Sequence, residues 1–229
     1  MNSFTLERVV RFTKKLVRKA IGCSCLEDYS VKERRQIWSM VNPLEKKHIH
    51  NCQLLEDRLK MLEYMPKNAV CAEIGILRCE FSQSILEITQ PSKLHLIDID
   101  PTAVNIAREK FKDNIASGQV EVHLGDSAAT IMALSENYFD WSYVDGDHSY
   151  SGAKRDLEAT RLKLKTDGLI AVNDYVFFSV SDFKKYGVLE AVNDFCINHH
   201  FEMLFLAFQG RSYNDVVLRQ ITENVQSIS

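Results

Sequence analysis

Short apolar segments alternate with amphipathic helical segments from Asn68 to the carboxyl end of the 229-residue chain, and few folds accommodate this pattern. The apolar segments are predicted to be strands, at 69–76, 94–100, 120–125, 139–145, 169–174, 201–208 and 215–221. Helices are predicted in the first five gaps, at 80–89, 102–117, 127–136, 153–165 and 186–199. Repeated strand–helix units with nearly continuous apolar strands indicate a parallel sheet buried between helices.

The last two predicted strands are separated only by residues 209–214. A connection of that length makes a hairpin, whereas parallel neighbours need a long crossover. The final strand is therefore predicted to run antiparallel to its neighbour.

The first 66 residues follow another pattern and are predicted to be an N-terminal extension, with the main domain at 67–229. Residues 30–65 are predicted to form two helices, divided at Asn42-Pro43 because proline disfavours helix in the preceding residue. Residues 1–22 combine an apolar helical stripe with a basic face. Such a helix could lie peripherally on an anionic membrane, dock on a partner or pack on its own domain, and these alternatives stay open.

Composition excludes several classes of protein. A net charge of −3 and a pI near 6.2 argue against nucleic-acid binding, which normally requires a basic excess. No apolar run approaches the roughly 20 residues that span a bilayer. The six cysteines contain no CxxC pair, which fits a reducing, cytoplasmic setting, and Cys23 and Cys25 alone make a poor metal site.

The first predicted strand ends in Glu73-x-Gly75, where glycine allows a tight turn and a close approach to a ligand. A single glycine is not the GxGxxG pattern of dinucleotide sites, and Glu73 would repel a pyrophosphate. The carboxylate suits a ligand that carries positive charge, such as an amino group or a sulfonium.

The next two strands also end in acidic residues. Asp98 follows Gly75 by about twenty residues, the position from which an acid binds ribose hydroxyls, whereas Asp100 is better placed to cap the next helix. Asp126, followed by Ser127, could read an adenine edge or cap a helix, and both alternatives stay open.

Polar side chains gather after the strands at 139–145 and 169–174. The residues concerned are Asp145, Asp147, His148, Asn173 and Asp174. Because the carboxyl ends of neighbouring parallel strands open onto one crevice, these side chains are predicted to surround one small volume. Carboxylate and amide oxygens beside a histidine suit a hard cation and a proton acceptor.

The strand ends at Glu73-x-Gly75, Asp98 and Gly125-Asp126 resemble the S-adenosylmethionine site of class I methyltransferases, over residues 68–221. The resemblance implies an α/β, Rossmann-like fold: a seven-stranded, mostly parallel sheet with helices on both faces, an antiparallel last strand and an N-terminal helical extension. Cys79 departs from it, because many members have glycine there. It implies that S-adenosylmethionine is bound by Glu73, Gly75, Asp98, Ile99, Asp126, Ser127 and Asp145.

Within that class, the run from Asp145 to Tyr150 and the later Asn173-Asp174-Tyr175 look like macrocin-type O-methyltransferases, which act on antibiotic sugars. This resemblance implies a magnesium ion on Asp145, Asn173 and Asp174, although Asn173 departs from the usual acidic pair. It places the proton acceptor at Asp147 or His148, and a nearby cation would keep the histidine neutral. Asp147 could equally be a turn residue, and His148 could cap the following helix.

We therefore expect a magnesium-assisted, S-adenosylmethionine-dependent O-methyltransferase that acts on a small hydroxylated substrate, such as a sugar or glycoside. The helices at 30–65 would cover the cleft and help to select the acceptor, and they could exchange between the subunits of a homo-oligomer, although the sequence does not reveal the oligomeric state. One alternative is a metal-independent methyltransferase. Another is a catalytically inactive, membrane-associated binding protein on the same fold, anchored by residues 1–22.

Overall fold

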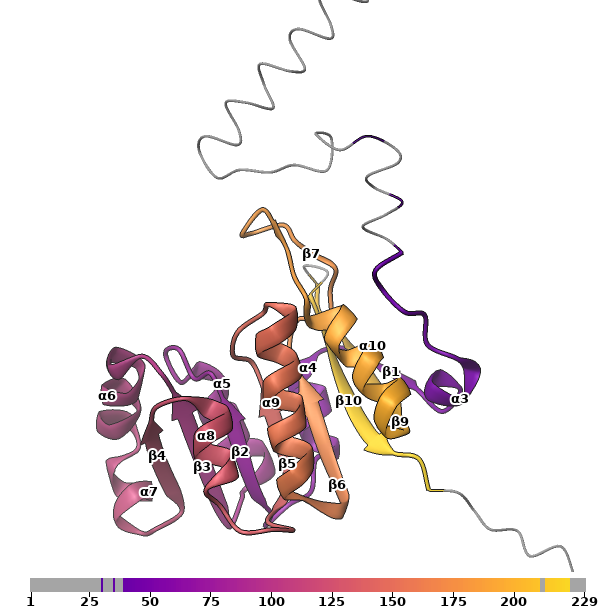
Figure 1. The fold of residues 1–229 in the computed structure, drawn as a ribbon. Coiled ribbons are helices and arrows are strands. Elements are labelled where there is room, and N and C mark those ends of the chain that lie inside the picture. Colours follow the sequence, from indigo (N-terminus) through magenta and orange to yellow (C-terminus); the bar gives the residue numbers. More distant parts are fainter. Residues whose placement is uncertain (1–29, 31–34, 36–38, 211–212, 223–229) are drawn as a thin grey trace, which may run out of the picture.

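In the part of the chain that the computed structural model describes, eight strands form one sheet with helices on both faces (Figure 1). The described residues are 30, 35, 39–210 and 213–222, so the predictions for residues 1–22 and for Cys23 and Cys25 lie outside them. The elements are, in chain order, α3 (Lys46–Ile49), β1 (Gln53–Leu55), α4 (Arg58–Tyr64), β2 (Val70–Ile74), α5 (Glu80–Thr89), β3 (Lys93–Asp98), α6 (Pro101–Lys110), α7 (Lys112–Ala116), β4 (Val120–Leu124), α8 (Ser127–Met132), β5 (Phe139–Val144), α9 (Tyr150–Lys163), β6 (Leu164–Val172), β7 (Phe178–Ser179), β8 (Lys184–Lys185), α10 (Val188–His199), β9 (Phe201–Phe208) and β10 (Asn214–Gln220).

The sheet has the order β1-β9-β10-β6-β5-β2-β3-β4, and all of these strands are parallel except β10. The seven predicted strands are present as β2–β6, β9 and β10, and the antiparallel last strand is confirmed (Figure 1). The chain leaves β2 for β3 and β4 and then crosses back to β5, on the other side of β2. Ligands of open α/β sheets bind at the carboxyl ends of the strands beside such a reversal.

Two apolar cores hold the helices against the sheet. On one face, Leu62 of α4 and Ile85 of α5 are buried with Trp141 of β5. On the other face, Leu157 of α9 and Val192 of α10 are buried. Each large apolar side chain removed from water contributes about 1.5–3 kcal/mol, so both faces of the strands have to be covered.

The segment 30–65 differs from the prediction of two helices. Its described part contains the short helices α3 and α4 with the strand β1 between them, and β1 pairs in parallel with β9 through Leu54 and Leu206. Main-chain hydrogen bonds to the open edge of β9 outweigh the local helical pattern, because strand preference depends strongly on context.

The helix predicted at 102–117 is divided into α6 and α7. Phe111 stands at the junction with φ of −109° and ψ of 24°, which ends α6, and its ring is buried. The short antiparallel pair β7 and β8, which lies in a predicted loop, projects beyond the carboxyl ends of the parallel strands (Figure 1). None of the helices among the described residues has both the length and the apolar character needed to cross a bilayer.

Candidate active site

The turn after β2 brings the ends of two strands into backbone contact. Gly75 has φ of +81°, a conformation that strains other residues, and its amide donates to the carbonyl of Ile97 (2.9 Å). A Cβ added to Gly75 would overlap the carbonyl oxygen of Asp145 at the end of β5. The predicted tight turn is present, and the close approach that glycine allows here is to the backbone of Asp145.

Asp98, at the end of β3, holds the same turn together. Its Oδ2 accepts hydrogen bonds from the amides of Ile76 (2.9 Å) and Leu77 (3.4 Å), and its Oδ1 accepts one from the amide of Asp100 (2.8 Å). Each carboxylate oxygen can accept more than one hydrogen bond, so these contacts leave acceptor capacity for a ribose. Asp100 itself caps α6 by accepting from the amide of Thr102, as predicted.

A cavity of about 610 Å³ lies at the carboxyl ends of β2, β3, β4 and β5. That volume is within the usual range of small-molecule and cofactor sites. The residues predicted to bind the cofactor that line it are Gly75, Asp98, Ile99, Asp126, Ser127 and Asp145. The sequence prediction and the shape of the structure therefore agree on the position of this site.

Glu73 is not part of the cavity wall, and the prediction that it binds the cofactor stays a prediction. Alternation along β2 turns it away from the cavity, towards Ser82 of α5, and it is 2% exposed. Its Oε2 has no hydrogen-bond partner, and burial raises the pKa of its carboxyl to about 8.

The far side of the cavity is formed by the start of α8 and by α9. Asp126 caps α8 by accepting from the amide of Ala129 (2.9 Å), and it pairs with Arg155 (3.3 Å). It therefore caps the helix and also lines the cavity. The hydroxyl of Ser127 donates to Asp156 (2.6 Å). Arg155 and Asp156 were not predicted, because they lie within a regular helical pattern. The signal that could have identified Asp156 was an acidic residue at a position of α9 that faces the core.

Three ionisable side chains meet where β5 and β6 end. The Nε2 atom of His148 lies 3.5 Å from Asp145 Oδ1 and 3.3 Å from Asp174 Oδ2, which are ion-pair distances rather than those of short hydrogen bonds. The imidazole stacks on the ring of Tyr186, with 4.6 Å between the ring centroids. We call Asp145, His148 and Asp174 the central cluster.

The prediction of a neutral His148 applies beside a bound cation, whereas without one the central cluster favours the protonated form. Burial disfavours the imidazolium, but the hydrogen bonds and charges of Asp145 and Asp174 outweigh this and raise the pKa of His148 to about 10. With these partners His148 carries a proton at neutral pH. It becomes a proton acceptor only when another cation engages the two carboxylates.

Asp147, the other candidate base, is a turn residue. Its carboxylate accepts from the amide (2.9 Å) and the hydroxyl (2.8 Å) of Ser149, and these hydrogen bonds lower the pKa of its carboxyl. A carboxylate stabilised in this way is a weaker base. Ser149, and not His148, caps α9. The geometry therefore favours His148 over Asp147.

Asn173, the predicted amide ligand, is fixed by a buried network. Its Nδ2 donates to the hydroxyl of Tyr143 (3.0 Å) and to Asp215 (3.1 Å), and Tyr143 also donates to Asp215 (2.7 Å). With Nδ2 engaged, Oδ1 is the atom that Asn173 can offer to a cation. Asp174 follows with φ of +54°, a conformation that aspartate tolerates better than most residues.

A second cavity, of about 630 Å³, lies on the other side of Asp174. Its wall comes from α4, the β7 region and the loop before β10, and it consists of Arg58, Asn173, Asp174, Val180, Ser181, Gln209, Gly210 and Tyr213. Arg58 belongs to the segment 30–65, whose predicted role in selecting the acceptor stays a prediction. No sequence signal distinguished this arginine from others on the N-terminal helices.

The magnesium site predicted at Asp145, Asn173 and Asp174 stays a prediction, and the donor atoms that these residues offer are oxygens. Two carboxylate oxygens, from Asp145 and Asp174, face the same point, which the His148 imidazolium occupies. Together with the Asn173 amide they form an all-oxygen set of the kind that magnesium prefers. Among the described residues, the group whose possible ligand atoms all lie within 4.8 Å of one another is a different one, His95, Glu121 and His123.

Comparisons with known proteins agree with this geometry. A family model described as a methyltransferase domain matches residues 72–175. No curated protein matches the chain. A SAM dependent methyltransferase from Aquifex aeolicus is 16% identical, with 82% of this chain and 98% of that chain covered and a TM-score of 0.56. The B. subtilis M1A22 tRNA methyltransferase TrmK is 14% identical, with 73% and 67% covered and a TM-score of 0.55.

The pyocyanin biosynthetic protein PhzM is 16% identical, with 68% of this chain covered and a TM-score of 0.52, and the chain spans about half of its length (51%). At these identities, likeness to the solved structures shows the fold. The match to the methyltransferase domain includes the glycine turn, Asp98 and the central cluster. The methyltransferase-domain match over residues 72–175, together with the fold, supports a class I methyltransferase, the class that takes its methyl group from S-adenosylmethionine.

Proposed function

We propose that the chain is an O-methyltransferase that acts on a hydroxyl of a small molecule, such as a sugar or glycoside, with assistance from magnesium. The observation that carries the proposal is the position of the central cluster between the two cavities. Asp145 and His148 line the cavity at the glycine turn, and Asp174 lines the other. A methyl donor and an acceptor in these cavities would meet at the cluster.

The first cavity suits S-adenosylmethionine. The Gly75 turn admits a ligand against the backbone, Asp98 offers a carboxylate for ribose hydroxyls, and Asp126 with Ser127 stands at the far end, where an adenine edge would lie. The acidic wall also favours a ligand that carries a sulfonium and an amino group over one that carries a pyrophosphate.

Methyl transfer requires a nucleophile held in line with the methyl group, at roughly 3 Å. A neutral hydroxyl is a poor nucleophile, and magnesium bound to Asp145, Asn173 and Asp174 would make it easier to deprotonate. His148 would then lose the carboxylate partners that keep it protonated. Its imidazole could accept the proton of the acceptor hydroxyl, while Arg58 and Tyr213 contact the rest of the acceptor in the second cavity.

A metal-independent methyltransferase is the second candidate, and one observation favours it. The Nε2 atom of His148 lies within ion-pair distance of both Asp145 and Asp174, so the imidazolium would balance their charge without a metal. In that case the imidazolium cannot take up a further proton, and one of the two carboxylates would accept the proton of the acceptor. Removal of divalent cations separates the two candidates.

The test begins with calorimetric titration of the full-length chain with S-adenosylmethionine, for the wild type and for Asp98→Ala. Saturable binding that the substitution abolishes supports the assignment of the first cavity. Hydroxylated acceptors are then screened with magnesium and with EDTA, and methylated product is measured. Activity only with magnesium supports the first candidate, and equal activity in EDTA supports the second. A wild type that does not bind S-adenosylmethionine overturns both.

A further inference from the structure

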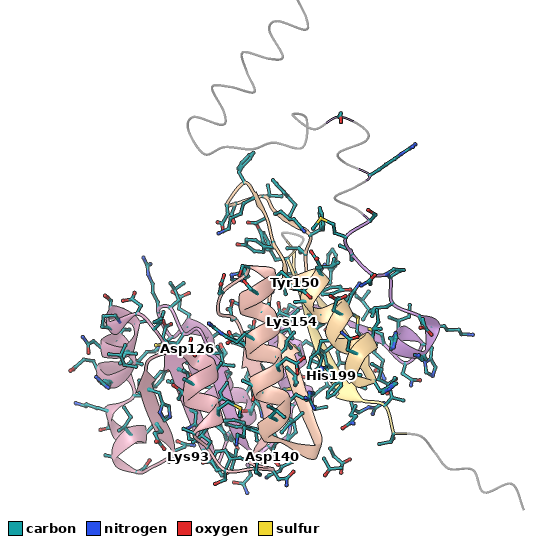
Figure 2. The ribbon with its side chains drawn as sticks, viewed as in Figure 1. Lys93, Asp126, Asp140, Tyr150, Lys154 and His199 are labelled. Atoms are coloured by element: carbon teal, nitrogen blue, oxygen red, sulfur yellow. The ribbon has the colours of Figure 1, made fainter. Side chains whose placement is uncertain are left out.

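A second group of potential ligands lies on β3 and β4, away from the cavities. In the parallel register His95 stands opposite Glu121, and His123 follows Glu121 by two residues. Because alternate residues of a strand share a face, all three side chains leave the same face of the sheet. Figure 2 shows Lys93, which begins β3 and pairs with Glu121, at the end of the sheet opposite Tyr150, at the start of α9.

Three atoms of this group converge. The Nδ1 atom of His95 is 2.9 Å from Nε2 of His123, and that same Nε2 is 3.7 Å from Oε1 of Glu121. All three ligand atoms lie within 4.8 Å of one another. A metal bound at about 2.0–2.2 Å places its ligand atoms roughly 3–3.5 Å apart, so small side-chain rotations would complete the geometry.

The outer contacts of His95 are those of an oriented metal ligand. His95 is 1% exposed, and its other nitrogen, Nε2, lies 3.0 Å from the hydroxyl of Tyr138. Metal-binding histidines commonly use their second ring nitrogen in this way, which fixes the ring and its tautomer. The ring of Phe139 packs edge-on against His95 and limits its rotation further.

Charge and access also suit a metal. Lys93 pairs with Oε2 of Glu121 at 2.9 Å, which leaves Oε1 facing the histidines. The Glu121 side chain is 48% exposed and that of His123 is 19% exposed, so an ion and its waters can enter from solvent.

We propose that His95, Glu121 and His123 form a zinc site that is separate from the methyl-transfer site. Two imidazoles and one carboxylate suit zinc and similar borderline metals, whereas magnesium prefers oxygen ligands alone. Zinc here would tie the edge strand β4 to β3. Because β4 leads directly into Gly125 and Asp126, the site would stabilise one wall of the first cavity.

The experiment is calorimetric titration of the full-length chain with zinc, in the wild type, His123→Ala and a matched control, His199→Ala. His199 is also a partly exposed histidine beside a carboxylate, at 2.6 Å from Glu158, but it lies on α10. We expect one zinc site in the wild type and in His199→Ala, and its loss in His123→Ala. Tyr138→Phe, which keeps all three ligands, is expected to weaken binding about tenfold or more.

Two further measurements separate this site from others. Asp174→Asn should leave zinc affinity unchanged, because it alters only the central cluster. Cobalt in place of zinc should give the absorption of a nitrogen and oxygen site without thiolate bands. If His123→Ala fails to fold, Glu121→Gln, at a half-exposed position, serves in its place. The proposal would be overturned if the wild type bound no zinc or if cobalt gave thiolate bands. Equal zinc affinity in the wild type and the ligand variants would also overturn it.

Discussion

Gly75 and Asp145 meet backbone to backbone at the base of the first cavity, where a Cβ at position 75 would overlap the Asp145 carbonyl oxygen. The amide of Asp145 also donates to the carbonyl of Ile74 (2.8 Å), so the ends of β2 and β5 are held in register. This contact joins the glycine turn to the central cluster. The methyl donor and the proposed base are thereby positioned by the same pair of strand ends.

Gly75→Ala is expected to destabilise the chain and to abolish binding of S-adenosylmethionine. Gly118→Ala is the matched control, because Gly118 has φ of +80° and has no atom within 4 Å of an added Cβ. Both variants incur the cost of a left-handed residue, about 1–2 kcal/mol. Only Gly75→Ala adds the overlap with Asp145, worth about 1–3 kcal/mol more. Urea unfolding measures the difference, and equal losses in the two variants would contradict the close approach.

Asp98→Ala is expected to weaken binding of S-adenosylmethionine at least about tenfold, because it removes a charged acceptor for the ligand and for the turn. Asp57→Ala provides the control. Asp57 accepts from the amide of Lys60 (2.7 Å) and caps α4, so its loss costs a comparable local hydrogen bond outside the cavity. Calorimetric titration compares the two, and equal affinity in both variants would count against Asp98 as a cofactor residue.

His148→Asn is expected to lower kcat by about 10²- to 10⁴-fold, the usual contribution of a general base, with little change in the affinity for S-adenosylmethionine. The comparison is with His199→Asn, which removes a histidine paired with Glu158 outside both cavities. Steady-state kinetics with an acceptor from the screen measures both variants. A normal kcat in His148→Asn would remove this residue from the mechanism.

The parts of the site that depend on strand ends could be predicted from the sequence. Gly75, Asp98 and Asp126 follow apolar strands, and parallel order brings such ends together whatever the details of packing. The direction of the Glu73 side chain was not predictable in this way, because it depends on where β2 ends and which face is covered. Arg58 was missed because α4 reaches the second cavity through tertiary packing that no local pattern records.

Tertiary contacts also explain why the structure differs from the sequence prediction at β1. The segment at Gln53–Leu55 carries a helical pattern and still forms β1, because β9 offers it an open edge. The protonation of His148 depends on Asp174, which is distant in sequence and close only in the folded chain. Long-range contacts of this kind decide charge and strand addition, whereas local periodicity decides the order of helices and strands.

Glu73 gives the stability of the chain an unusual dependence on pH. Burial raises the pKa of its carboxyl from 4.5 to about 8 in the folded chain. Between these values the folded state holds a proton that the unfolded state has released, so the contribution of Glu73 to stability is fully present below about pH 4.5 and is lost as the pH rises through 8. Glu73→Gln keeps a neutral side chain at every pH and removes this dependence.

We therefore expect Glu73→Gln to gain stability relative to the wild type between pH 6 and pH 9, by roughly 2–3 kcal/mol. Urea unfolding at the two pH values measures this change. Glu109→Gln, at an exposed position of α6, should show no such trend. The sign of the change in stability with pH is decisive, because a carboxyl group whose ionised form is stabilised by the fold would make the chain more stable as the pH rises. If the free energy of unfolding of Glu73→Gln changes with pH in the same way as that of the wild type, the carboxyl is already ionised in the folded chain.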